Sequence, residues 1–97
     1  MNSIDASAEN RHWRSQFRHE PWYLQAYTFG DYAPAFLTGY QGYARLAGNT
    51  FDAIERLLRA DYDANRGKSG LSWLEARPAI RAAWERAAVS AKAAANA

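Results

Sequence analysis

The segment NTFDAIERLLRADYDANRG, residues 49–67, repeats apolar side chains at intervals of three and four residues. This spacing brings them to one face of an α-helix and does not fit the two-residue repeat of a half-buried strand. No segment of the chain sustains the two-residue apolar repeat of a strand between turn signals. The pattern therefore predicts an all-α fold. The apolar positions of this helix are Phe51, Ile54, Leu57, Leu58 and Tyr62.

Residues on either side of this repeat mark the ends of the helix. Thr50 or Asn49 can accept hydrogen bonds from the first backbone amides, and Gly67 can adopt the left-handed conformation that ends helices. The predicted helix therefore spans residues 50–66. Its polar face carries two acidic residues, each four positions before an arginine, which predicts ion pairs within the helix. These pairs are Asp52 with Arg56 and Glu55 with Arg59.

A ladder of aromatic residues, YAPAFLTGYQGY at residues 32–43, predicts a second helix over residues 31–47. Asp31 can cap its start, Pro34 fits a first helical turn, and Gly48 suits a left-handed cap after its end. Rings four residues apart share one face of such a helix. The ladder consists of Tyr32, Phe36, Tyr40 and Tyr43.

Two glycines interrupt this ladder. Gly39 and Gly42 each cost about 1 kcal/mol in helix propensity, but they would let another helix or a ring approach the backbone closely. We therefore assign the middle rings, Phe36 and Tyr40, to the core. The rings at the two ends are predicted to reach water with their hydroxyls and to meet any partner: Tyr32 and Tyr43.

The third main helix is predicted over residues 72–92. Ser72, with Glu75 three residues later, forms a capping box at its start. Pro78, at the sixth helical position, removes one backbone hydrogen bond and is predicted to kink the helix or to split off its first turn. The alanine-rich residues 91–97 offer little to bury and are predicted to fray.

The N-terminal part is less regular. Residues 1–10 lack apolar periodicity and are predicted to form a mobile lead. A short helix over residues 11–18 follows, and Pro21 ends it because the residue before a proline disfavours the helical conformation. An irregular aromatic segment then leads to the second helix. A single helical domain is thus predicted over residues 11–90.

With 97 residues and few Leu, Ile and Val, the chain must build its core mainly from its aromatic rings, which bury roughly 150–250 Å² each. Any ring left exposed would contribute to a partner patch. The predicted core consists of Phe36, Tyr40, Phe51, Ile54, Leu58, Tyr62, Leu71, Trp73, Ile80 and Trp84. The predicted partner surface consists of Trp22, Tyr23, Tyr32, Tyr43, Arg14 and Arg18.

Few residues point to catalysis or to metal binding. The chain has no cysteine, which excludes disulfides, thiolate chemistry and cysteine-bound zinc. His12 and His19, with Glu20, would hold a metal only if they converged, and solvated histidines are the simpler interpretation. Asp61 and Asp63 point to different helix faces and do not form an acid–base pair. We therefore expect no metal and no cofactor.

The loop NRGKSG, residues 65–70, contains the letters of a phosphate-binding loop. That motif needs a glycine where this chain has Tyr62, and it follows a strand rather than a helix. A helix end followed by a turn explains the same letters. The sequence therefore predicts neither nucleotide binding nor enzymatic activity.

Two binding functions are consistent with the sequence. The first is contact with another protein or a second copy of the chain, suggested by the aromatic excess. The alternative is weak nucleic-acid binding by arginines and stacked rings, although a net charge of +2 gives it little support. Its basic residues would be Arg11, Arg14, Arg18, Arg77, Arg81, Arg86 and Lys92.

Several motifs occur together: HWR at residues 12–14, DYAPAF at residues 31–36, and the stretch from TFDAIERLL to IRAAWERA at residues 50–87. In this order they resemble a family of small, uncharacterised bacterial helical proteins. The family shares a Trp-Arg start, a Tyr-x-Pro-Ala-aromatic step, a Phe-Asp-x-x-Glu helix, an Arg-Gly-x-Ser-x-Leu-x-Trp turn and a final Ala-Trp helix. Tyr62 stands where relatives carry Trp, which keeps a ring in the core.

The resemblance implies a cytoplasmic helical domain without established enzymatic activity, associated with bacterial stress responses. The sequence itself agrees with that location. Its start lacks the basic and apolar regions of a signal peptide, and no run reaches the roughly 18–20 apolar residues of a membrane span. We therefore expect a soluble cytoplasmic protein.

Overall fold

A computed structural model describes residues 4–95, which contain four α-helices, one short 3-10 helix and no strand. The prediction of an all-α bundle is therefore confirmed, and the three predicted main helices match α2, α3 and α4 to within a few residues. The elements are α1 (Ala6–Gln16), η1 (Phe17–His19), α2 (Phe29–Leu46), α3 (Phe51–Asn65) and α4 (Trp73–Ala95).

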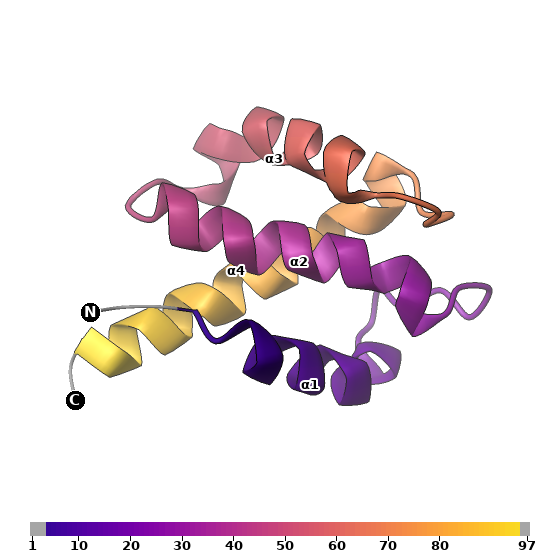
Figure 1. The fold of residues 1–97 in the computed structure, drawn as a ribbon, viewed down its shortest axis with the longest axis horizontal. Coiled ribbons are helices and arrows are strands. Elements are labelled where there is room, and N and C mark those ends of the chain that lie inside the picture. Colours follow the sequence, from indigo (N-terminus) through magenta and orange to yellow (C-terminus); the bar gives the residue numbers. More distant parts are fainter. Residues whose placement is uncertain (1–3, 96–97) are drawn as a thin grey trace.

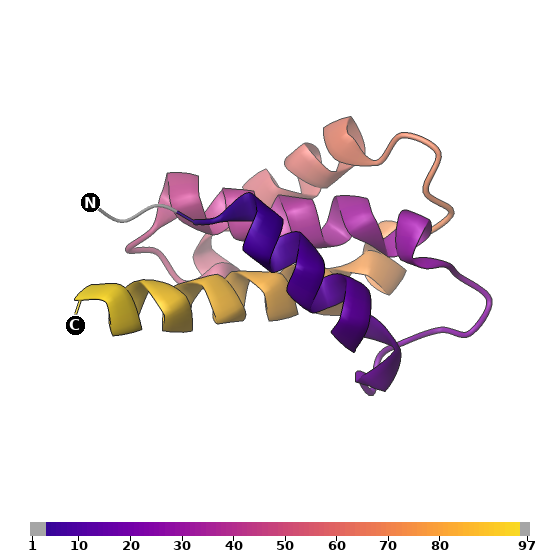
Figure 2. The ribbon, with the colours of Figure 1, turned by 60° about the horizontal axis from the view of Figure 1, so that its bottom comes forward.

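Helix α2 is the centre of the bundle. Figure 1 shows α1 and α3 on opposite sides of it, with α4 behind, and the chain reversing direction at each connection. Figure 2 shows α1 lying obliquely across the bundle. Trp13 of α1 stacks on Phe36 of α2, and Glu9 of α1 forms an ion pair with Arg86 of α4. Every other helix therefore packs against α2, and α4 is joined to α1 as well.

Helix α1 starts earlier than the sequence predicts. The predicted mobile lead covers residues 1–10, but Asp5 accepts a hydrogen bond from the amide of Ala8 and caps a helix that begins at Ala6. The apolar repeat is missing because only Glu9 and Trp13 are buried along this helix. Residues 1–3 lie outside the part that the structure describes.

Helix α2 also starts before the predicted position. Thr28, not Asp31, is the cap, and the two form a reciprocal capping box: the Asp31 amide donates to Thr28 Oγ1 and the Thr28 amide donates to Asp31 Oδ2. Pro34 consequently lies inside the helix rather than in its first turn. The predicted end is confirmed, since the helix stops at Leu46 and Gly48 has a positive φ of 97°.

The starts of α3 and α4 agree with the sequence. Thr50 caps α3, and Ser72 and Glu75 exchange hydrogen bonds as a capping box before α4. Pro78 does not split off a turn, because α4 is continuous across it. Helix α4 also extends through most of the predicted frayed tail at residues 91–97, whose last two residues lie beyond the described range.

All ten predicted core residues are buried. Burial also includes three rings that the predicted core lacks: Trp13, Phe17 and Tyr32. Leu57, on the predicted apolar face of α3, is instead exposed. None of the fourteen aromatic side chains falls in the exposed class, and the rings outside the core are half-buried.

Two of the three glycines of α2, Gly39 and Gly42, stand where neighbouring side chains or backbone leave no room. A Cβ on Gly39 would overlap the Ile80 carbonyl oxygen of α4 and lie 2.7 Å from the Cβ of Ala83. A Cβ on Gly42 would overlap Leu58 of α3. The predicted close approach at both glycines is therefore confirmed, and it allows α2 to contact α3 and α4 along one stripe.

Candidate binding surface on the first helix

Four of the six predicted partner residues lie near one corner of the molecule, at the end of α1 and in the segment after it. Arg14 and Arg18 are exposed, and Trp22 and Tyr23 are half-buried against the core. The Phe17 ring lies between two of them. Tyr23 meets this ring edge-on with centroids 5.3 Å apart, and the Arg18 guanidinium carbon lies 5.6 Å from its centre.

Tyr32 does not belong to that surface. Its relative exposure is 0%, and its hydroxyl accepts a hydrogen bond from the Leu24 amide at 2.9 Å and donates to the Trp22 carbonyl at 3.4 Å. Burial raises its pKa. The prediction that this hydroxyl reaches water is wrong, because the irregular segment folds back over it. Tyr32 instead fixes that segment to α2.

Tyr43 lies away from this corner, near the other end of α2. Its half-buried ring meets Trp84 of α4 edge-on, with centroids 5.1 Å apart. It is therefore part of the contact between α2 and α4, and the structure does not bring it together with the arginines of α1.

The outer face of α1 carries a row of arginines. Arg11 and Arg14, three residues apart on the helix, and Arg18 in η1 are all exposed, and within residues 4–95 none forms an ion pair. The guanidinium carbon of Arg14 lies 4.5 Å from the centre of the Phe29 ring, a cation–π contact that holds it in place. We call Arg11, Arg14, Arg18, Tyr23 and Phe29 the α1 surface.

Four other arginines of the chain are matched to carboxylates: Arg45, Arg77, Arg81 and Arg86. Arg77 makes a bidentate contact with Glu55 at 2.7 and 2.9 Å, and Arg81 lies 3.6 Å from Asp52. Arg86 lies 3.2 Å from Glu9. Three of the basic residues that the sequence assigns to a nucleic-acid surface are therefore engaged within the molecule.

The predicted ion pairs within α3 are wrong. Asp52 and Glu55 turn towards the arginines of α4 instead of towards Arg56 and Arg59 on their own helix. Two parallel hydrogen bonds to one carboxylate are stronger than a solvated ion pair on a helix surface. This difference explains why Glu55 binds Arg77 rather than Arg59. The hydrogen bonds from Arg77 lower the pKa of Glu55.

Residues considered for chemistry remain scattered. His12 packs edge-on against Trp13 with centroids 4.7 Å apart, and burial lowers its pKa, while His19 is exposed in η1. Among residues 4–95 no three His, Asp or Glu side chains group in a way that could hold a metal ion. Ser69 of the NRGKSG loop is buried and donates to the Asp31 carbonyl, a structural contact.

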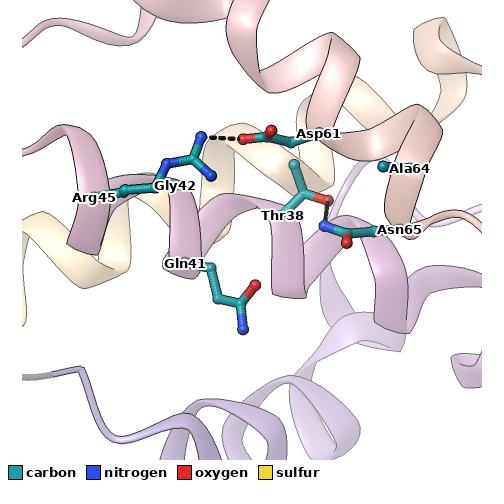
Figure 3. A pocket seen from close by; sticks show the side chains of 7 residues that line it. All are labelled: Thr38, Gln41, Gly42, Arg45, Asp61, Ala64 and Asn65. Carbon is teal, nitrogen blue, oxygen red and sulfur yellow. Dashed lines mark hydrogen bonds and ion pairs between the residues drawn. The ribbon is translucent and has the colours of Figure 1, made fainter.

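A small pocket lies between α2 and α3, with a volume of about 90 Å³. Figure 3 shows that four of its polar side chains pair with one another: Arg45 binds Asp61, and the Asn65 amide donates to Thr38 Oγ1 at 3.1 Å. The amide of Gln41 also lines the pocket and points away from both pairs. The remaining lining residues, such as Gly42 and Ala64, carry no reactive group. This pocket therefore joins two helices and offers no acid–base pair.

Sequence reasoning missed two features of this region. One is the burial of Phe17 beneath Arg18, although Trp13 and Phe17 stand four residues apart and could have indicated a buried face. The other is the unpaired state of the α1 arginines, which no local pattern indicates. Whether these arginines are paired depends on where the carboxylates of the folded chain lie.

No protein family, curated protein or solved structure matches this chain. The fold and the surface define it as a small all-α bundle with a basic, aromatic-edged helix face, and the resemblance described above stays a prediction. Across residues 4–95, none of the helices has the length and apolar character needed to cross a membrane.

Proposed function

We propose that this protein is non-enzymatic and acts through protein–protein contact, with the α1 surface binding an acidic segment of its partner. The observation that supports this most strongly is the row of exposed arginines without carboxylates, in a chain that pairs four other arginines internally. Like charges three or four residues apart on a helix destabilise it by about 0.2–0.5 kcal/mol per pair. An acidic ligand would relieve that repulsion.

The neighbours of these arginines suit a protein ligand. Half-buried Phe29 and Tyr23 border the row, and Leu24 is 39% exposed beside them. Aromatic residues and arginine are enriched in protein interfaces, where a ring supplies apolar area and a guanidinium supplies directed hydrogen bonds. The partner segment that fits this surface combines carboxylates with apolar side chains.

Nucleic acid is the second candidate, because Arg11, Arg14 and Arg18 would also attract phosphates. The ion pairs of Arg77, Arg81 and Arg86 leave this candidate with fewer free cations than the sequence suggests. We therefore rank it below protein binding. The proposal also places the protein in the bacterial cytoplasm and in a stress response, as the resemblance implies.

Two charge-matched variants test the proposal. Arg14→Gln/Arg18→Gln removes two charges from the α1 surface, and Lys68→Gln/Lys92→Gln removes two exposed charges outside it. We expect the tagged protein to capture a partner from a stressed lysate of its own organism. The α1 variant should retain at most about one tenth of the captured partner, and the lysine variant should retain all of it.

Nuclease treatment and light scattering complete the experiment. Capture that survives nuclease supports a protein ligand, and capture that disappears assigns the α1 surface to nucleic acid. A concentration-dependent dimer lost in the α1 variant would identify a second copy of the chain as the partner. Absence of any partner, or equal capture by both variants, contradicts the proposal.

A further inference from the structure

A second basic site lies on the opposite side of the central helix from α1, on α3 (Figure 1). There, a hollow of about 260 Å³ is lined by Glu55, Arg56, Arg59 and Trp73. The hollow opens where α3 faces the start of α4. It shares no residue with the α1 surface, so an inference about it stands independently of the proposed function.

The acidic residues next to this hollow are paired with arginines of α4. Local spacing would pair Asp52 and Glu55 with the two arginines of the hollow, but both acids bind arginines of α4 instead. The Glu55 carboxylate, although part of the wall, has both oxygens engaged by Arg77 at 2.7 and 2.9 Å. Arg56 and Arg59 form no ion pair anywhere in residues 4–95.

One side of the hollow is packed into the core. Trp73 is buried, and its ring centroid lies 6.4 Å from that of Tyr62 in the core. The guanidinium carbon of Arg59 lies 6.0 Å from the Trp73 ring, near the outer limit of a cation–π contact. An arginine positioned in this way loses less side-chain entropy when it binds an anion.

We propose that this hollow binds an anionic group, a carboxylate or a phosphate, between Arg56 and Arg59. A planar guanidinium matches both groups with two parallel hydrogen bonds, and charge-assisted bonds of this kind are about twice as strong as neutral ones. The volume of the hollow accommodates a group of this size without displacing Trp73. The bound anion supplies Arg56 and Arg59 with the negative charge that Asp52 and Glu55 do not provide, because these two acids bind arginines of α4.

NMR titration of the full chain tests the site with inorganic phosphate and, separately, with acetate. We expect saturable shifts in the side-chain Nε–H signals of Arg56 and Arg59 and in the Trp73 indole signal, at millimolar anion. Saturation by either anion supports the site. The anion that saturates at the lower concentration shows whether a phosphate or a carboxylate is the natural group.

Matched variants separate this site from general charge attraction. Arg56→Gln/Arg59→Gln is expected to weaken binding at least tenfold, whereas Lys68→Gln/Lys92→Gln, with the same change in net charge, leaves it within twofold. All four substituted residues are exposed, and an unchanged amide spectrum checks that both variants fold. Linear shifts without saturation, or equal weakening in both variants, would overturn the proposal.

Discussion

Gly39 lies where α2 crosses α4, and its missing side chain sets how closely the two helices approach. The obstacle to a side chain there is backbone, the Ile80 carbonyl, together with the Cβ of Ala83. Neither can rotate away. Gly30, near the start of the same helix, has only the Thr28 hydroxyl within reach, at 3.5 Å from a built Cβ.

Alanine at these two glycines is expected to have opposite effects. Gly39→Ala overpacks the α2–α4 crossing and lowers the free energy of unfolding by about 1–3 kcal/mol. Gly30→Ala changes it little or raises it by up to about 1 kcal/mol, because alanine favours the helix. Urea denaturation measures both, and a Gly39→Ala variant as stable as Gly30→Ala would refute the close packing.

Helix α1 is held by an apolar contact and by a buried charge. Trp13 stacks on Phe36 with centroids 4.7 Å apart. Glu9 is only 5% exposed, and its Oε1 atom lies 3.2 Å from Nε of Arg86. These two atoms do not meet in hydrogen-bond geometry. The Trp13 indole nitrogen also has no hydrogen-bond partner within the described residues. The distance makes this an ion pair, but an incompletely satisfied one.

Replacing Arg86 is expected to lower the free energy of unfolding more than replacing Glu9. Arg86→Leu leaves the Glu9 carboxylate buried without a cation and lowers the free energy of unfolding by about 3–5 kcal/mol. Glu9→Leu costs less, because the Arg86 side chain is 35% exposed and its charge can reach water. The double variant Glu9→Leu/Arg86→Leu recovers most of the loss. Chemical denaturation of all three checks this order, and equal losses in the single variants would contradict it.

At the scale of the whole molecule, carboxylates join segments that are far apart in the sequence. Asp31 accepts hydrogen bonds from the amides of Thr28 and Gly70, which lower its pKa. The Ser72 amide lowers the pKa of Glu75, and the Tyr27 hydroxyl also donates to that carboxylate. With Glu55, these acids link α2, α3 and α4 through residues far apart in the sequence.

Stability is therefore expected to fall in acid. The unfolded chain binds protons on Asp31, Glu55 and Glu75 more readily than the folded chain, because folding lowers each pKa. Their contribution is complete above the ordinary values of 3.8 and 4.5 and is lost as the pH falls through the folded pKa values. Folding also lowers the pKa of His12, so stability decreases further as the pH falls below the ordinary histidine value of 6.5.

Urea titrations at about pH 7 and about pH 3 measure this effect. The midpoint should drop in acid while the slope of the transition stays the same. The same midpoint at both pH values would contradict the role of these carboxylates. Asp31→Asn serves as the control, since this variant should lose stability at neutral pH and show a smaller drop in acid.

Local sequence alone determined the helical class and most helix ends. The three- and four-residue repeat of Phe51, Ile54 and Leu58, the Ser72–Glu75 capping box and Gly48 act within a few residues, so they can be recognised without the fold. The start of α1 was missed because it has little apolar surface of its own and is stabilised by Asp5 and by contacts with α2 and α4.

Only the tertiary structure decided which charges and rings are available for binding. Tyr32 is buried because a distant segment folds over it, and Arg56 is unpaired because α4 brings Arg81 to Asp52. Burial and ion pairing depend on residues that meet only after the helices pack, and local spacing does not contain that information. The sequence therefore predicts a helical bundle, and the packing of that bundle selects the α1 surface and the hollow on α3.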